Sequence, residues 1–286
     1  MSSKSAYKSF AVAGGGLVGL PVVNALAAKD VPVILLSRPG AAAKTVPSGV
    51  QVIQVDFNDA AAIAAVLKEH KVDVVLSTIT TMAAAAQKPL VDAAKFAAVK
   101  LFVPSEFGLP SDGHTEGPLG DKAKIAAHLK SVGIPSTRIY TGTFIEFIPW
   151  LVDYSDGSTV KVVGKGETPV SFTSISDIAG FVAHVLTACP PSDLEDRILR
   201  LQGDRSTLNG LAPLFKTSVE HVDSLTGETG EFKRGLQIAM DLGAGSTGWD
   251  GAKKVEGTGS NAAGSGNALW PGHQWKSIKD VHNLHV

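Results

Sequence analysis

Cysteine is almost absent from this chain: among its 286 residues there is a single one, Cys189. One thiol cannot close a disulfide bond within the chain or build a cysteine-based zinc site. The eight histidines are scattered, and none lies at the usual metal-ligand spacing from another histidine, a cysteine or an acid. We therefore expect no metal centre, and the lone thiol agrees with a reducing compartment.

An excess of charge of one sign and a long apolar run are also missing. The 26 basic and 27 acidic residues leave a formal net charge of −1, so no surface for nucleic acid is indicated. No stretch reaches the roughly 18 apolar residues that cross a membrane, and the first ten residues lack the apolar core of a signal peptide. We expect a cytoplasmic protein, monomeric or homodimeric, without nucleic-acid or membrane partners.

What the chain does have is a repeated pattern between residues 10 and 103: a short apolar run, a turn, then an Ala-rich stretch at helical spacing. The apolar runs do not alternate with polar residues, which is typical of strands covered on both faces. Crossover helices are expected at Asp59–His70, with Asp59 as N-cap, and at Ala83–Val99. Strands are expected at Phe10–Ala13, Val31–Leu36, Val50–Val55, Val72–Leu76 and Lys100–Val103.

Beyond Phe107 the pattern becomes a mixture of α and β. Residues 243–267 contain eight glycines with Ser, Thr and Asn, a composition too flexible to pack a core, so a long loop or mobile lid is expected there. The other expected elements are a surface loop at 108–120, a helix at 122–131, an apolar run at 134–140, a hairpin through 160–172, a helix at 175–187 opening at Ser174 or Ser176, and a strand at 197–201.

The turn after the first expected strand carries a glycine pattern. It reads Gly14-Gly15-Gly16-Leu17-Val18-Gly19, which is G-x-G-x-x-G. Gly14 allows a tight turn, Gly16 lets the backbone approach a pyrophosphate, and Gly19 lets the following helix lie close to the strand. The helix N-terminus then faces the anion. The alternative is an ordinary tight turn, but its place between first strand and first helix predicts a dinucleotide site.

The residue after the second strand indicates which dinucleotide. An NAD site usually offers Asp or Glu to the ribose there, whereas this chain has Ser37 and Arg38. A guanidinium can bind a 2′-phosphate through paired charge-assisted hydrogen bonds. Unless Arg38 is only an exposed surface residue, the cofactor is NADP(H).

These patterns predict an α/β fold with a Rossmann-type doubly wound parallel sheet and a smaller mixed α/β C-terminal region. Residues 1–150 are expected to form the NADP(H)-binding domain. Residues 151–286 are expected to form mostly the substrate-binding region, with elements at about 173–202 packing back on the sheet.

Three segments together resemble the NmrA-like and isoflavone reductase-like group of atypical short-chain dehydrogenases. They are the glycine turn with Arg38; the sequence VPSEFG at residues 103–108, preceded by Gln87; and Lys122-Ala123-Lys124, followed by Gly133-Ile134-Pro135 and Thr143-Phe144. Leu269-Trp270-Pro271-Gly272 resembles the C-terminal region of fungal members. The loop at 109–119 and the glycine-rich tract depart from the plant reductases, so the plant substrates are not carried over.

The usual catalytic tyrosine of short-chain dehydrogenases is missing, because none of the three tyrosines has a lysine four positions later. The resemblance instead implies Lys122 as the group that touches the nicotinamide side of the cofactor and handles the proton. A lysine in an apolar pocket has its pKa lowered toward neutrality, which makes it a workable acid for an alkoxide or enolate. The alternatives for Lys122 are a helix-surface lysine or a ribose hydrogen-bonder.

The expected function is NADPH-dependent reduction of a small, largely apolar carbonyl or enone, aromatic or terpenoid-like. A non-catalytic NADP(H)-binding redox sensor and a non-redox isomerase or cyclase that retains the cofactor remain alternatives, because the fold alone does not separate them. Phe147, Ile148 and Trp150 are expected to line the substrate site, or else simply to belong to the core. The expected cofactor contacts are Gly14, Gly16, Leu17, Val18, Gly19, Ser37, Arg38, Thr78, Ser105, Glu106, Phe107, Lys122, Thr143 and Phe144.

Overall fold

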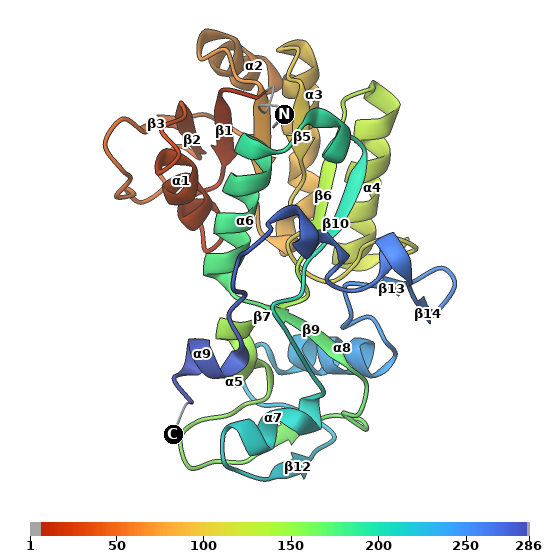
Figure 1. Ribbon diagram of the computed structural model, residues 1–286. Coiled ribbons are helices and arrows are strands. Elements are labelled where there is room, and N and C mark those ends of the chain that lie inside the picture. The colour runs from red at the N-terminus through yellow and green to blue at the C-terminus, as the bar shows by residue number, and fades with distance from the viewer. Residues whose placement is uncertain (1–6, 285–286) are drawn as a thin grey trace. The chain divides into compact units, whose positions relative to one another are not determined.

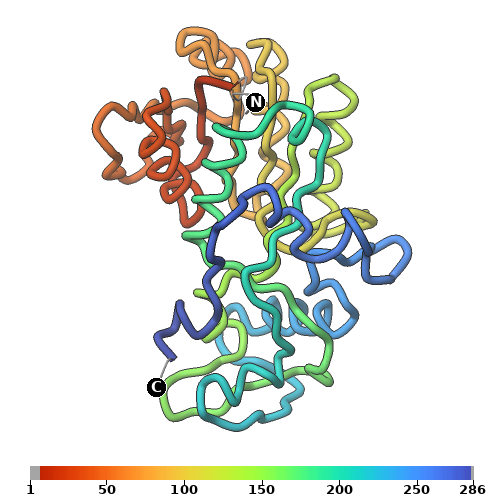
Figure 2. The backbone as a smooth tube through the Cα atoms, in the orientation of Figure 1, coloured from red at the N-terminus to blue at the C-terminus, as the bar shows by residue number. Residues whose placement is uncertain are grey.

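The computed structural model describes residues 7–284, drawn as a ribbon in Figure 1 and as a tube in Figure 2. Its contacts divide the chain into two compact units. The first unit comprises residues up to 106, 111–139 and 178–199; the second comprises 107–110, 140–177 and those from 200 onward. The chain therefore passes between the units five times, after residues 106, 110, 139, 177 and 199. The sequence had indicated one main boundary, at residue 150.

A five-stranded parallel sheet forms the centre of the first unit, in the order β3-β2-β1-β4-β5. Phe10, at the start of β1, lies beside Val33 of β2 and Val74 of β4, and the other pairings are parallel as well. The predicted doubly wound parallel sheet is confirmed. The strands are β1 (Phe10–Ala13), β2 (Val33–Ser37), β3 (Gln51–Gln54), β4 (Val74–Ser77) and β5 (Leu101–Val103).

The edge strand β3 departs from the expectation that every strand is covered on both faces. Gln51, Val52 and Gln54 are exposed. An edge strand has a neighbour on one side only, and the two glutamines can remain in water at no cost, so this strand needs less cover. The apolar residues next to it, Val55 and Phe57, are buried and complete the core instead.

Helices cover both faces of this sheet (Figure 1). One face packs on α2, α3 and α4 through a core that includes Ile63, Leu90, Phe102 and Leu129. The opposite face carries α1 and the buried side of α6. The helices of this unit are α1 (Gly19–Ala27), α2 (Ala60–Glu69), α3 (Lys88–Phe96), α4 (Gly117–Val132) and most of α6 (Ile175–Ala188), together with the short 3₁₀ helices η1 (Thr81–Gln87) and η3 (Pro191–Asp193).

Helix boundaries follow local capping chemistry. Asp59 caps α2 as predicted, because its carboxylate accepts a hydrogen bond from the Ala62 N–H at 2.9 Å. Ser174 accepts from the Asp177 N–H at 3.0 Å and opens α6. The helix expected at 83–99 is instead η1 followed by α3, with Pro89 in the first turn of α3. The loop expected to last until residue 120 ends earlier, because α4 begins at Gly117.

The second unit holds three small sheets. In the largest, β9 lies between β11, antiparallel, and β7, parallel. The strands are β7 (Thr143–Phe144), β8 (Val160–Val162), β9 (Val170–Thr173), β11 (Asp204–Ser206), β12 (Val219–His221), β13 (Trp249–Asp250) and β14 (Val255–Glu256). Its helices are α5 (Ile148–Leu151), α7 (Leu208–Leu214), α8 (Gly230–Asp241) and α9 (Ile278–His282), with η2 (Ile145–Phe147), η4 (Gly259–Asn261) and η5 (Ser265–Leu269).

Two further strands, β6 (Thr137–Tyr140) and β10 (Arg197–Arg200), pair with each other and run from the first unit into the second. The strand expected at 197–201 is therefore confirmed. The hairpin expected through 160–172 is wrong. Strand β8 pairs with β12, in parallel, whereas β9 pairs with β7 and β11, so the two apolar runs belong to different sheets.

The glycine-rich segment is packed, and the prediction that it cannot join a core is wrong for its first part. Residues 243–248 are buried. A Cβ at Gly243 would lie 2.4 Å from the Trp249 ring, and one at Gly245 would lie 2.8 Å from Val170. Glycine serves here to let backbone and side chains approach closely, and β13, β14, η4 and η5 follow within the same segment.

No helix among residues 7–284 is long and apolar enough to cross a membrane. Within the same range, no group of three or more His, Cys, Asp or Glu side chains is arranged to hold a metal ion.

Candidate functional site

The glycine turn between β1 and α1 has three different local geometries. Gly14 has a φ of +101°, which residues with a Cβ rarely adopt. Around Gly16 a Cβ would meet no atom within 4 Å, so the backbone there is open to a ligand. A Cβ at Gly19 would lie 1.9 Å from the Gly14 carbonyl oxygen, so only glycine lets α1 start this close to the turn. Between them, Leu17 is 52% exposed and Val18 is half-buried.

The end of β4 holds this turn in place. The Thr78 hydroxyl donates a hydrogen bond to the Gly14 carbonyl at 2.7 Å, and the Thr78 N–H donates to the Ala13 carbonyl at 2.9 Å. Strands β1 and β4 are neighbours at the point where the chain reverses the order in which strands are added. Open parallel sheets bind ligands at the carboxyl ends of the strands at such a point.

Two cations lie on the loop that follows β2. Ser37 ends β2 and is buried, while Arg38 is exposed. Lys44, farther along the same loop, has its Cγ 3.4 Å from the position that a Cβ would take at Gly15, so its stem lies against the glycine turn. Within residues 7–284, neither the Arg38 guanidinium nor the Lys44 ammonium has a hydrogen-bond or ion-pair partner.

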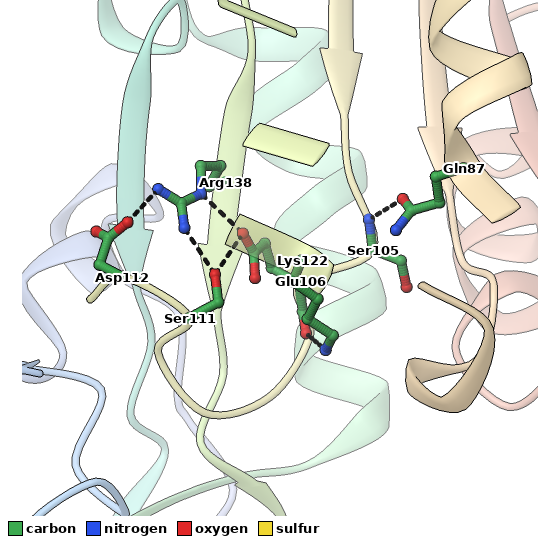
Figure 3. A network of polar contacts seen from close by, with 7 residues as sticks. All are labelled: Gln87, Ser105, Glu106, Ser111, Asp112, Lys122 and Arg138. Carbon is green, nitrogen blue, oxygen red and sulfur yellow. Dashed lines mark hydrogen bonds and ion pairs between the residues drawn. The ribbon is translucent and has the colours of Figure 1, made fainter. Parts of the chain in front are cut away.

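The end of β5 is joined to the end of β4 by Ser105. The Ser105 hydroxyl donates to the Ile79 carbonyl at 2.6 Å. Its N–H donates to the Gln87 side-chain oxygen at 2.8 Å (Figure 3). Gln87 in turn donates to the Ala84 carbonyl at 3.1 Å. Ser105 and Gln87 therefore fix the shape of this edge, and their polar atoms are engaged within the protein.

Lys122 is buried at the same edge. It lies on the face of α4 that also carries Ile125 and Leu129, and its side chain is 4% exposed. Its Nζ donates a hydrogen bond to the Glu106 backbone carbonyl at 2.5 Å (Figure 3). Burial lowers the pKa of Lys122 from 10.5 to about 8, against the opposing effect of the Glu106 carboxylate, which favours the charged form. A lysine in this state can give up or take up a proton near neutral pH.

Glu106 itself belongs to a buried polar network. Its Oε1 accepts hydrogen bonds from Arg138 Nε at 2.7 Å and from the Ser111 hydroxyl at 3.0 Å. Arg138, on β6, also donates to Ser111 at 2.7 Å and to Asp112 at 2.5 Å (Figure 3). Glu106 Oε2 is buried without a hydrogen-bond partner among the described residues. The Glu106 side chain thus points toward Arg138 (Figure 3).

The structure therefore brings the expected residues of the first unit to one edge of its sheet. A chain of hydrogen bonds runs from Gly14 to Thr78, then from Ile79 to Ser105, and from the neighbouring Glu106 to Lys122. Three of the expected cofactor contacts, Phe107, Thr143 and Phe144, belong to the second unit. Phe107 is buried and has a φ of +21°.

The expected substrate residues of the second unit have two different environments. Ile148 is fully buried in the core of this unit, so its visible role is packing. Phe144, Phe147 and Trp150 are partly exposed and follow one another at ring-centroid distances of 5.9 Å. The row continues to Phe232 of α8, 6.2 Å from Trp150 and 44% exposed.

Sequence patterns missed Lys44, Arg138 and Phe232. Lys44 lies in a loop with no regular spacing, so nothing in the chain connects it with the glycine turn. Arg138 meets Glu106 across 32 residues, and Phe232 joins its aromatic row across 82 residues from Trp150. The one usable signal was an arginine inside an otherwise apolar strand, because a buried guanidinium requires an anionic partner.

The NmrA-like family model matches residues 8–272. The chain belongs to the NmrA-like family. This finding confirms the resemblance carried by the glycine turn, VPSEFG and the Lys122 segment.

Curated relatives of this NmrA-like protein include an isoflavone reductase homolog of Zea mays, 34% identical, with 71% of this chain and 70% of that protein covered. Eugenol synthase 1 of Petunia hybrida is 29% identical, with 80% and 77% covered. Among solved structures, leucoanthocyanidin reductase of Vitis vinifera in its binary complex with NADPH has a TM-score of 0.78 at 19% identity, with 96% and 98% covered. A structure of isoflavone reductase has a TM-score of 0.77 at 20% identity, with 98% and 100% covered. These structures share the fold of this chain.

Proposed function

We propose that this NmrA-like protein is an NADPH-dependent reductase of a small, largely apolar carbonyl or enone compound, aromatic or terpenoid-like. The observation that carries the proposal is the buried Lys122, with a pKa of about 8, at the same sheet edge as an open glycine turn. The curated relatives named above, together with the leucoanthocyanidin reductase solved with NADPH, support the same reaction class.

The residues of the first unit fit an NADP(H) molecule. Gly16 leaves space that any Cβ would narrow, and the start of α1 offers backbone N–H groups to a pyrophosphate. Arg38 and Lys44 bring to the loop after β2 two cations that have no partner within residues 7–284, and a ribose 2′-phosphate is recognised at this place in this kind of fold. No acid follows β2 to bind the free ribose hydroxyls of NAD.

Bound NADPH would supply a hydride to the polarised C=C or C=O bond of the substrate. The chain's own residues supply the proton. Below pH 8 the Lys122 ammonium carries it, and Nζ donates it to the enolate or alkoxide oxygen. The partly exposed rings of Phe144, Phe147 and Trp150 provide an apolar surface suited to an aromatic or terpenoid-like substrate.

Calorimetric titration with NADPH, NADP⁺, NADH and NAD⁺ tests the cofactor. We expect tight binding of the two phosphorylated forms and weak binding of the others. In the variant Arg38→Glu, the affinity for NADPH should fall by about ten-fold to a hundred-fold, since a charge-assisted hydrogen bond contributes about 1.5–3 kcal/mol. Unchanged selectivity in that variant would remove the 2′-phosphate assignment.

A screen of aldehydes, ketones and enones for NADPH oxidation tests the reaction. With an active compound in hand, Lys122→Met should abolish most turnover while the NADPH affinity stays nearly intact. The matched control is Lys124→Met, on the exposed side of α4, which should keep normal turnover. Binding of NADPH without oxidation of it by any compound would favour a sensor, and product formation without net NADPH consumption would favour an isomerase or cyclase.

A further inference from the structure

We propose that Arg138, acting through Glu106, is a positioning residue for Lys122: it holds in place both the carbonyl that Lys122 contacts and the buried carboxylate beside it. This inference rests on the proton-transfer role proposed for Lys122. Arg138 contacts Glu106, Ser111 and Asp112, and it is not assigned a catalytic role.

Glu106 has different partners for its backbone and its side chain. Lys122 Nζ contacts the backbone carbonyl of Glu106, and the side chain of the same residue is held by Arg138 and Ser111. Glu106 is 1% exposed, so its carboxylate has no water to replace these partners. Anchoring the side chain therefore restricts the position of the backbone carbonyl that accepts the hydrogen bond from Lys122.

Arg138 also holds the loop that starts at Glu106. The chain leaves the first unit after Glu106 and re-enters it at Ser111. Arg138 binds residues on both sides of this excursion: Glu106 before it, and Ser111 and Asp112 after it. One guanidinium thus clamps both ends of the segment 107–110, a task that its planar, multi-donor geometry suits and a lysine ammonium does not.

The Glu106 carboxylate also acts on Lys122 electrostatically. A carboxylate buried beside Lys122 stabilises the ammonium form, which opposes the effect of burial on the pKa of the lysine. Arg138 supplies the compensating charge for this carboxylate, and Oε2 is left without a hydrogen-bond donor among the described residues. Removing Arg138 leaves the carboxylate with one hydroxyl donor, Ser111, so that it is held less firmly beside Lys122.

The other charged groups around Lys122 are paired or are not buried. The helix η1, which packs on α4, contains no ionisable residue. From α3, Asp92 is bound by Lys88 and by His128, and Lys95 lies in the last turn. On α4, Asp121 pairs with Lys124 at the surface. The preceding loop adds His114 and Glu116, neither of which is buried, and Asp112, which pairs with Arg138.

The experiment is an NMR titration of the lysine side chains in protein labelled with ¹³C at lysine Cε, with the Lys122 signal assigned from Lys122→Arg. In Glu106→Gln, the pKa of Lys122 should fall by about one unit or more, since a neighbouring anion is lost. In Arg138→Met it should fall as well, because the Glu106 carboxylate and carbonyl are then no longer held beside Lys122. A direct effect of the guanidinium would do the opposite, since removing a like charge raises the pKa of a lysine.

The double variant Glu106→Gln/Arg138→Met should match Glu106→Gln alone. Asp121→Asn, which removes an exposed acid next to Lys122 in the sequence, is the control and should leave the Lys122 signal within a few tenths of a unit. If Arg138→Met does not fold, Arg138→Lys keeps one charge without the clamp and should give a smaller fall. A rise in any Arg138 variant, or no change in Glu106→Gln, overturns the inference.

The titration needs no substrate, so the two proposals fail separately. A fall in the pKa of Lys122 with no NADPH-consuming reaction upholds the Arg138 inference and removes the proposed function. Where a substrate is known, the acid-to-base transition in the pH profile of kcat should move to lower pH in Glu106→Gln, by the shift measured for Lys122, while KM for NADPH changes little. Turnover with an unmoved transition would contradict the inference alone.

Discussion

At the scale of single residues, the glycine turn separates two uses of the same amino acid. The methyl group introduced by Gly19→Ala would lie 1.9 Å from the Gly14 carbonyl oxygen, which is a steric clash. The methyl group introduced by Gly16→Ala would have no atom within 4 Å. We therefore expect Gly19→Ala to lower the free energy of unfolding by roughly 2 kcal/mol or more. Gly16→Ala should leave the free energy of unfolding nearly unchanged but should lower the affinity for NADPH. Chemical denaturation and calorimetry measure the two effects, and equal stability losses in both variants would contradict this assignment.

Burial of Lys122 carries a stability cost. Its folded-state pKa, about 8, lies below the ordinary 10.5, so between these values the unfolded chain binds the extra proton and stability rises with pH. The cost is fully present below pH 8 and disappears above about pH 10.5. By linkage it amounts to at most on the order of 3 kcal/mol.

Lys122→Met should therefore stabilise the protein at pH 7, by less than that limit because the Glu106 carbonyl loses its donor. The gain should shrink as the pH is raised from 8 to 10. Denaturant unfolding of both proteins at pH 7, 8.5 and 10 measures it. If Lys122→Met destabilised the protein equally at all three pH values, burial of the charged Lys122 side chain would carry no stability cost.

At the scale of elements, the glycines of residues 243–248 make a packed segment. Gly243 combines a φ of +107° with a Trp249 ring 2.4 Å from any Cβ. Gly243→Ala should therefore lower the free energy of unfolding by about 2–3 kcal/mol. Gly235→Ala, inside α8 with open space around it, is the matched control and should raise that free energy by about 0.5–1 kcal/mol. If residues 243–248 formed a mobile lid, Gly243→Ala would not lower the free energy of unfolding.

The same elements show which features a sequence reveals. The strands β1, β2, β4 and β5 are buried apolar runs whose neighbours are set by the βαβ rule, so pattern and topology agree. The hairpin failed because Val160–Val162 pairs with Val219–His221, far along the chain, and no local pattern encodes such a pairing. Glycine content misled for a related reason, since it signals flexibility and close packing alike. Capping was readable because Asp59 and its partner are three residues apart.

The candidate site was predictable to the same degree. Residues inside contiguous motifs, such as Gly14, Gly19 and Lys122, were found, and the structure gives each a distinct environment. Arg138 and Lys44 depend on contacts formed only after folding, with Glu106 and with the glycine turn, so no spacing rule points to them.

At the scale of the whole molecule, neither unit is a continuous piece of chain. The first unit is completed by residues 178–199, and the second includes residues 107–110. We expect a single proteolytic nick in an exposed loop to leave the fragments associated under native conditions. Limited proteolysis followed by gel filtration, with denaturing electrophoresis of the recovered peak, checks this. Release of a folded N-terminal fragment ending near residue 139 would contradict it.

The five passages of the chain between the units also limit how such a protein can diversify. A single recombination event exchanges everything on one side of a junction, so it cannot transplant the second unit from a relative intact. That unit is encoded in three separate stretches, 107–110, 140–177 and 200 onward. Chimeras built to exchange that unit must graft all three together, and Arg138, which clamps the ends of the shortest stretch, has to match the graft.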